Sequence, residues 1–99
     1  MKRYVLSREA EGDLIAIKSY LLEKAGIEVS RYVMQELRSS IRLLAKTPRL
    51  GHRRPDLTDE NVLFWPVYSY LIVYDPDPQP IEVVRILHGS RDIADILDR

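Results

Sequence analysis

Three side chains near the end of the chain, Arg85, His88 and Arg91, are of the types that could bind or cleave a phosphodiester. RNA cleavage by attack of the 2′-hydroxyl needs a base, an acid and a cation on the phosphate. Histidine and tyrosine could move the protons, and arginine could hold the phosphate. However, Arg85 and His88 are three positions apart, so on a regular strand they face opposite ways unless a bulge intervenes. The structural alternatives are a strand-end histidine and a partly buried arginine that is paired with a carboxylate or extends to the rim.

The sequence lacks the residue patterns that metal-dependent catalysis, nucleophilic catalysis and phosphate-binding loops require. The chain has no cysteine, and its two histidines, His52 and His88, are far apart with no carboxylate cluster at metal-ligand spacing. No serine lies in a Gly-x-Ser-x-Gly setting, and the four glycines are too scattered for a phosphate-binding loop. We therefore expect neither a metal nor a cofactor.

The phosphodiester candidates lie at the end of a predicted β-hairpin. Its strands are Tyr70–Asp75 and Ile81–His88, both rich in Val, Ile and Tyr, joined by a loop with three prolines. Side chains alternate between the two faces of a strand. In the first strand one face carries Tyr70, Ile72 and Tyr74, and the other carries Leu71 and Val73. In the second strand one face carries Ile81, Val83, Arg85 and Leu87, and the other carries Glu82, Val84, Ile86 and His88. Both faces are mostly apolar, so both need cover.

Two helices precede this hairpin. The first runs from Arg8 to about Lys24 behind the N-cap Ser7, with an apolar stripe at Ala10, Leu14, Ile17 and Leu21. Gly26 separates it from a second helix over 28–46, whose predicted buried stripe is Val29, Val33, Leu37, Ile41 and Leu44. Short connections make such a pair an antiparallel helical hairpin.

Strands are predicted at Lys2–Leu6 and Val62–Val67, a long loop at Thr47–Asn61, and a last helical turn after the cap Asp92. The predicted fold is a single α+β domain over residues 1–99. An N-terminal strand and a helical hairpin pack on one face of a small antiparallel sheet, with a short C-terminal helix. Since two helices cover one face, we expect the other to be an apolar, partly open partner surface.

Charge is distributed unevenly along a chain of zero net charge. Seven bases against one acid occupy residues 31–54, and six acids with no base occupy residues 56–82. Arg31, Arg38, Arg42 and Lys46 line the second helix opposite its stripe, either as a solvated face or as a docking surface for an acidic partner. No apolar run can span a membrane and no secretory signal opens the chain, so we expect a cytoplasmic protein.

Four segments resemble the ParE branch of the RelE/ParE toxins. They are LSREAEGDLIAI (6–17), TPRLGHRRPDL (47–57), YLIVY (70–74) and VVRILHGSRD (83–92), and they follow the family's order. The resemblance implies a toxin of a type II toxin–antitoxin pair. Its partner would be a ParD-like antitoxin with a ribbon-helix-helix DNA-binding domain and a tail that wraps the toxin. DNA would then be contacted only through the antitoxin, within a hetero-oligomeric complex.

ParE-type toxins inhibit DNA gyrase, whereas RelE-type relatives cleave ribosome-bound mRNA. After His88 the chain reads Gly-Ser-Arg-Asp, where the nucleases carry catalytic aromatic and basic residues, so the non-enzymatic function is favoured. Arg85, His88 and Arg91 are then candidates for target inhibition. The alternatives are a ribosome-dependent endoribonuclease and a degenerate toxin that survives as an assembly partner.

Candidate antitoxin contacts are the apolar residues expected on the surface of the sheet and the first helix: Ile15, Leu22, Leu71, Val73 and Val83. Ile15 and Leu22 lie away from the helical stripe. They are either partly exposed residues covered by a loop or a partner-binding strip. The acidic residues at 56–60 could alternatively meet a basic antitoxin segment.

Overall fold

The elements follow the predicted order in a computed structural model that describes residues 3–98. They are β1 (Tyr4–Leu6), α1 (Arg8–Ala25), α2 (Ile27–Lys46), a 3-10 turn η1 (Pro48–Leu50), β2 (Leu63–Val67), β3 (Tyr70–Asp75), β4 (Ile81–His88) and α3 (Ile93–Leu97). Lys2, predicted as the start of β1, lies outside the described residues. Among residues 3–98, no helix combines the length and apolar character that crossing a bilayer requires.

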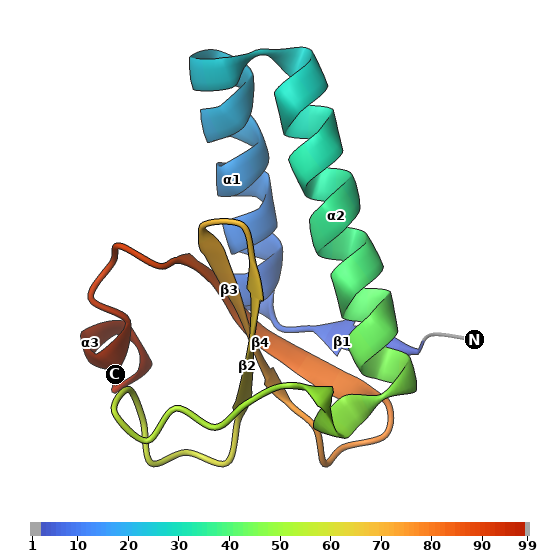
Figure 1. Ribbon diagram of the computed structural model, residues 1–99, viewed down its shortest axis with the longest axis vertical. Helices are drawn as coiled ribbons and strands as arrows, with labels where there is room; N and C mark the ends of the chain where they lie inside the picture. Colours follow the sequence, from blue (N-terminus) through green and yellow to red (C-terminus); the bar gives the residue numbers. More distant parts are fainter. Residues whose placement is uncertain (1–2, 99) are drawn as a thin grey trace.

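Local signals determine where the helical hairpin starts and turns. The Ser7 side chain accepts a hydrogen bond from the Ala10 backbone N–H at 3.0 Å, which caps α1 as expected. Gly26, at φ 94°, occupies a backbone region that side-chain-bearing residues avoid, and the chain reverses there into α2. Figure 1 shows the two long helices side by side.

The buried stripe of α2 differs from the predicted one in its first half. Ser30 and Met34 are buried there, whereas Val29 is 44% exposed and Val33 is only partly buried. Steps of four, three, four and three keep the observed stripe on one side of a helix with 3.6 residues per turn, but successive steps of four drift away. The hydroxyl of Ser30 is accommodated because it donates to the Lys18 carbonyl of α1 at 3.2 Å.

The sheet confirms the predicted fold class and adds one parallel strand pair. Its order is β1-β4-β3-β2, with β3 antiparallel to both neighbours and β1 parallel to β4. The sheet is therefore mixed rather than wholly antiparallel. The parallel pair is possible because both helices and two strands separate β1 from β4 and give the chain room to cross over.

A bulge in β4 changes which side chains share a face. Tyr74 pairs with Val83 but Val73 pairs with Arg85, so Val84 is the extra residue. Ile81 and Val83 pack towards the helices, and after the bulge Ile86 does so too, while Leu87 joins the opposite face. The predicted alternation of Ile81, Val83, Arg85 and Leu87 on one face is therefore wrong beyond Val83. On β3 the predicted alternation is confirmed.

The sheet face away from α1 and α2 is covered, which contradicts the predicted open surface. A second core of Phe64, Val73, Leu87 and Ile93 lies there. The 52–62 loop and α3 cover it with Leu57, Val62, Ile96 and Leu97. In Figure 1 this yellow-green loop and α3 lie close together. The Asp92 side chain caps α3 by accepting from the Asp95 N–H at 3.3 Å.

The long loop is anchored by the Tyr74 hydroxyl. This group donates to the Pro48 carbonyl at 2.7 Å and accepts from the Gly51 N–H at 2.9 Å. A Cβ on Gly51 would lie 2.6 Å from the same hydroxyl, so only glycine fits this close approach. His52 then exchanges two backbone hydrogen bonds with Phe64. The loop is thereby held to the sheet before it crosses to the far face.

Candidate functional site

Arg85 is bound within the chain. Its guanidinium makes two hydrogen bonds with the Asp13 carboxylate, Nε to Oδ2 at 2.8 Å and Nη2 to Oδ1 at 2.9 Å. Both side chains are largely buried, and hydrogen bonding to Asp13 raises the pKa of Arg85. This confirms the structural interpretation of Arg85 as an arginine paired with a carboxylate.

The location of this ion pair follows from the short first strand. Because β1 ends at Leu6, none of the strands within residues 3–98 pairs with this edge of β4 beyond Val83. The Ser7 hydroxyl donates to the Val84 carbonyl at 2.7 Å, and Asp13 Oδ2 accepts the Ile86 N–H at 2.9 Å. The side chains of the N-cap Ser7 and of Asp13 in α1 thus satisfy backbone groups that a longer strand would have paired.

His88 and Arg91 share a shallow pocket of about 350 Å³ beside α1. Its lining is Asp13, Ala16, Ile17, Tyr20, Tyr70, Ile86, His88, Ser90 and Arg91. The edge of the Tyr70 ring meets His88 at a centroid distance of 5.4 Å. Burial, together with the nearby Tyr20, raises the pKa of Tyr70 above its ordinary value.

One ring nitrogen of His88 is already engaged. Nδ1 lies 3.1 Å from the Ser90 backbone N and 2.7 Å from Ser90 Oγ. A backbone N–H can only donate, so Nδ1 is an acceptor and the neutral ring carries its proton on Nε2. The arrangement can bind an anion through Arg91, with His88 and two phenols as possible proton carriers.

The structure therefore places two of the three candidates, His88 and Arg91, in one pocket, and Arg85 lies outside it. The ladder is regular from Arg85, opposite Val73, to His88, opposite Tyr70, so the two residues stay on opposite faces. The bulge lies before Arg85 and does not bring them together. Sequence reasoning missed Asp13 as a site residue, although its place beside Ala10, Leu14 and Ile17 on α1 was a signal that it could contact the sheet.

The five apolar candidates for antitoxin contact differ in exposure. Ile15 is 68% and Leu22 41% exposed on α1, and Leu71 is partly buried. Val73 and Val83 have no exposed surface, because they belong to the two cores on opposite faces of the sheet. Their selection as surface residues is therefore wrong for this chain on its own.

Most of the exposed large apolar side chains lie on the two long helices, with Tyr68 at the β2–β3 turn and Val5 on β1. Tyr32 of α2 lies beside Tyr68 of the β2–β3 turn, with ring centroids 6.1 Å apart. Tyr68 has φ 55°, which is unusual for a bulky residue. Hydrogen bonding with Tyr32 raises the pKa of Tyr68 to about 12. Tyr32 and Tyr68 thus form an exposed aromatic pair where α2 meets the β2–β3 turn.

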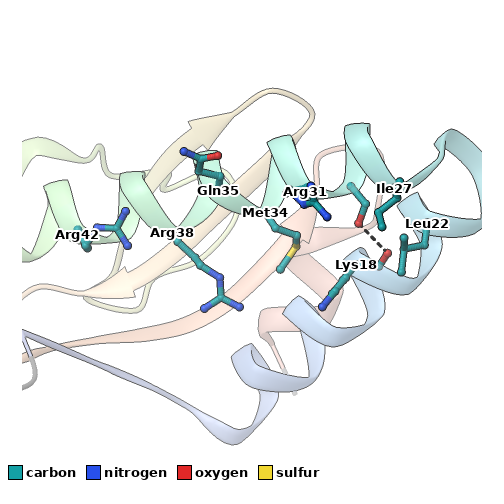
Figure 2. Close-up of a pocket in the computed structure, with 9 residues that line it drawn as sticks. Lys18, Leu22, Ile27, Arg31, Met34, Gln35, Arg38 and Arg42 are labelled. Atoms are coloured by element: carbon teal, nitrogen blue, oxygen red, sulfur yellow. Dashed lines mark hydrogen bonds between the residues drawn. The ribbon is translucent and has the colours of Figure 1, made fainter.

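The basic residues of α2 line a groove of about 540 Å³ between the helices. Figure 2 shows its lining: Lys18, Leu22, Ile27, Ser30, Arg31, Met34, Gln35, Arg38 and Arg42. Three of the four basic residues predicted along the second helix line this groove, and Lys46 does not. The cations therefore adjoin apolar side chains, rather than forming a purely solvated stripe opposite the core.

Acidic side chains gather where the 52–62 loop meets α3. A pocket of about 660 Å³ is lined by Asp56, Asp59 and Glu60 from the loop and by Asp92, Asp95 and Asp98 around α3. Arg54 binds Asp56 at 2.9–3.0 Å and lowers the pKa of that carboxyl. Across residues 3–98, no three His, Cys, Asp or Glu side chains are arranged to hold a metal ion.

A helical hairpin packed on one face of a small mixed sheet, with a short C-terminal helix, defines a compact α+β fold. A model of the "ParE toxin of type II toxin-antitoxin system, parDE" matches residues 4–93. The chain belongs to this family of toxins.

Named relatives agree with this membership, and a solved structure shares the fold. The chain is 31% identical to Toxin ParE1 of Caulobacter vibrioides over 94 residues, covering 91% of this chain and 92% of the relative. Toxin ParE3 of the same organism is 27% identical over 94 residues, covering 95% and 93%. A structure described as the chromosomal ParDE TA system from P. aeruginosa superposes with a TM-score of 0.73 at 20% identity, covering 86% of this chain and 92% of that chain. At that identity the superposition supports the fold alone.

Proposed function

We propose that this toxin inhibits DNA gyrase by binding rather than by catalysis, and that a ParD-like antitoxin neutralises it in the cytoplasm. The state of the three candidate residues carries the proposal. Arg85 is bound to Asp13, His88 Nδ1 is engaged with Ser90, and among these three only Arg91 makes no side-chain hydrogen bond within residues 3–98. A free cation beside tyrosines suits recognition of a protein target better than a complete acid–base–cation set.

The antitoxin half of the proposal is supported by membership of a family defined by a two-component system and by the exposed apolar residues of α1. Ile15 and Leu22 are seven residues apart in α1, so they lie on the same face of the helix. Both can therefore contact a single partner segment. The antitoxin would carry the DNA-binding domain, so this chain would reach DNA only within the hetero-oligomeric complex.

Supercoiling by purified gyrase tests the target. We expect the wild-type chain to inhibit supercoiling, and Arg91→Ala to weaken inhibition about tenfold or more if Arg91 is a contact hot spot. Arg53→Ala is the matched control, since Arg53 is an exposed arginine outside this pocket. Full supercoiling at a large excess of folded toxin, together with normal growth of cells that express it alone, would contradict the proposal.

A second candidate function is ribosome-dependent mRNA cleavage. One observation favours it: His88, Arg91, Tyr20 and Tyr70 line one pocket. Primer extension on cellular mRNA would then show cuts that disappear with His88→Ala, while thermal unfolding of the variant stays close to wild type. Absence of cuts from cells that are nevertheless arrested would leave gyrase inhibition as the better explanation.

Co-purification with a co-expressed ribbon-helix-helix antitoxin of the ParD type tests the proposed partner. Ile15→Gln should weaken the complex several-fold, because it places a polar amide in an apolar contact. Leu43→Gln is the control, because Leu43 is also an exposed apolar residue but lies on α2. A stable complex without growth arrest by the free toxin would instead indicate a degenerate toxin retained for assembly.

A further inference from the structure

Two exposed tyrosines meet where α2 passes the β2–β3 turn. Tyr32 is 56% and Tyr68 is 60% exposed, and their ring centroids lie 6.1 Å apart with the ring planes at 45°. Aromatic side chains carry large apolar surfaces, and tyrosine and tryptophan are enriched at interfaces. Neither ring lines the pocket of His88 and Arg91, and the proposed function gives neither ring a role. The pair is thus a separate surface feature that a ligand can reach.

The turn holds Tyr68 in a backbone conformation that its side chain disfavours. Val67 pairs with Tyr70, so Tyr68 and Ser69 are the two residues that join β2 to β3. Tyr68 has φ 55°, in a region where two-residue hairpin turns usually place glycine, asparagine or aspartate. The strained ring gains little burial, because most of it stays exposed. Strain of this kind clusters at binding sites, so the position of the Tyr68 ring beside Tyr32 points to a ligand.

Carboxylates without a cationic partner flank the two rings. Glu28 and Glu36 each lie four residues from Tyr32 on α2, so the three side chains share one side of the helix. Hydrogen bonding with Tyr32, burial, and the charges of Tyr32 and Glu36 raise the pKa of Tyr68 to about 12, so Glu36 lies close enough to act on this phenol. Within residues 3–98 neither glutamate forms an ion pair. The rings therefore lie in a negative field that no ion pair neutralises.

The surroundings of the pair indicate the class of ligand. A negative field beside two aromatic rings favours a cation, since the face of an aromatic ring is itself negative. Val29 is exposed three residues before Tyr32, so apolar surface lies on the same side of α2. Arg54 lines a hollow of about 450 Å³ with Tyr68, but it is bound to Asp56 and does not fill the place. A ligand with an apolar stem and a cationic head matches these features.

We propose that Tyr32, Tyr68 and Glu36 bind an arginine side chain of a partner protein. The guanidinium lies against the two rings and donates to the Glu36 carboxylate, and the methylene stem covers Val29. Arginine fits better than lysine, because its planar group stacks on aromatic rings and binds a carboxylate as a fork. Nucleobases also stack on tyrosine, but the two glutamates repel the phosphates that accompany them. The site goes beyond the proposed function and does not depend on gyrase.

A small arginine analogue tests the site. The probe is acetyl-arginine amide, titrated into the full chain with isotope-labelled tyrosine rings and followed by NMR. We expect saturable shifts of the Tyr32 and Tyr68 ring signals at millimolar concentration. The control is acetyl-citrulline amide, which has nearly the same shape without the charge. It should bind at least about fivefold more weakly, since it lacks both the cation–π attraction and the ion pair.

Single variants locate the contact. Glu36→Gln should weaken binding of the arginine analogue about fivefold, through loss of one partly exposed ion pair. Glu60→Gln is its matched control, since Glu60 is an exposed glutamate in the acidic pocket beside α3. Tyr68→Gly should abolish binding without lowering the melting temperature, because glycine adopts the positive φ of this position freely. Tyr32→Gln removes the other ring from an exposed helical position, where the fold is expected to persist.

Several results would overturn the inference: equal binding of the arginine and citrulline analogues, unchanged binding by Glu36→Gln, wild-type binding by Tyr68→Gly and Tyr32→Gln, or tighter binding of adenosine monophosphate. Self-association that disappears in Tyr68→Gly would overturn the assignment to a different protein, since an arginine of a second copy would then fill the site. None of these measurements uses gyrase or an antitoxin, so the site and the proposed function can fail separately.

Discussion

The two faces of the sheet are buried by different kinds of structure. On one face α1 and α2, 18 and 20 residues long, cover a large core that includes Leu37, Ile72 and Tyr74. On the other, a loop and the five-residue α3 cover four buried side chains. Helical stability in proteins comes mostly from packing, and α1 and α2 pack through long buried stripes, whereas α3 has a single buried residue and is one turn long. The helical face should therefore set global stability, and the α3 face should open first.

The largest effect is expected from Leu37→Ala on the helical face. Leu37 is fully buried between α2 and the sheet, and rigid neighbours limit collapse around the cavity. We expect a loss of about 4 kcal/mol in the free energy of unfolding, within the usual range for such truncations. Urea denaturation followed by circular dichroism measures it. A loss below that of Ile93→Ala would reverse the proposed ranking of the two faces.

Asp13→Ala should rank next. It leaves the Arg85 guanidinium without its carboxylate and the Ile86 N–H without an acceptor, at the edge where α1 meets β4. A loss of about 3 kcal/mol is expected. Arg85→Ala should cost less, because Asp13 still accepts from Ile86. Equal losses in the two variants would show that the backbone contact contributes little.

Ile93→Ala examines the smaller core. The residue is buried beneath α3, but this short helix can shift to fill the space, so we expect about 2 kcal/mol, the low end for such truncations. Hydrogen exchange should show α3 losing protection while α1 and α2 keep theirs. Uniform loss of protection over all three helices would mean that the two faces open as one unit.

The smallest effect is expected from Tyr74→Phe, which releases the loop that joins the two faces. Losing the contacts to Pro48 and Gly51 should cost about 1 kcal/mol at neutral pH. Burial raises the pKa of Tyr74 above its ordinary value of 10.0, so the unfolded chain ionises first. Wild-type stability should therefore be constant below about pH 10 and fall above it, with a shallower fall in the variant. Thermal unfolding between pH 7 and 11 compares the two, and identical alkaline profiles would contradict the assignment.

Much of the secondary structure could be predicted because its signals are local. The boundaries of β3 and β4, the Ser7 cap and the stripe of α1 follow from periodicity, β-branched residues and prolines in nearby positions. The first half of the α2 stripe was less predictable. Val29 and Met34 are both apolar, and only the packing of α1 against Ser30 decides which side of the helix is buried.

The candidate site was predicted less well than the fold. His88 and Arg91 were identified by type and lie in one pocket, but Arg85 is bound to a residue 72 positions earlier. The one-residue bulge at Val84 could not be predicted either, because it depends on the register between two strands. Such a bulge moves every later side chain of the strand to the other face.

The sequence by itself determined the order of the elements, the family and the gathering of positive charge along the second helix, because these properties are fixed by residue type and spacing. Only the tertiary structure decided that Asp13 engages Arg85, that the far sheet face is covered, and that three arginines of α2 adjoin Leu22 and Met34 in a groove. These features depend on which distant segments meet, and burial and hydrogen bonding between them cannot be read from either segment alone.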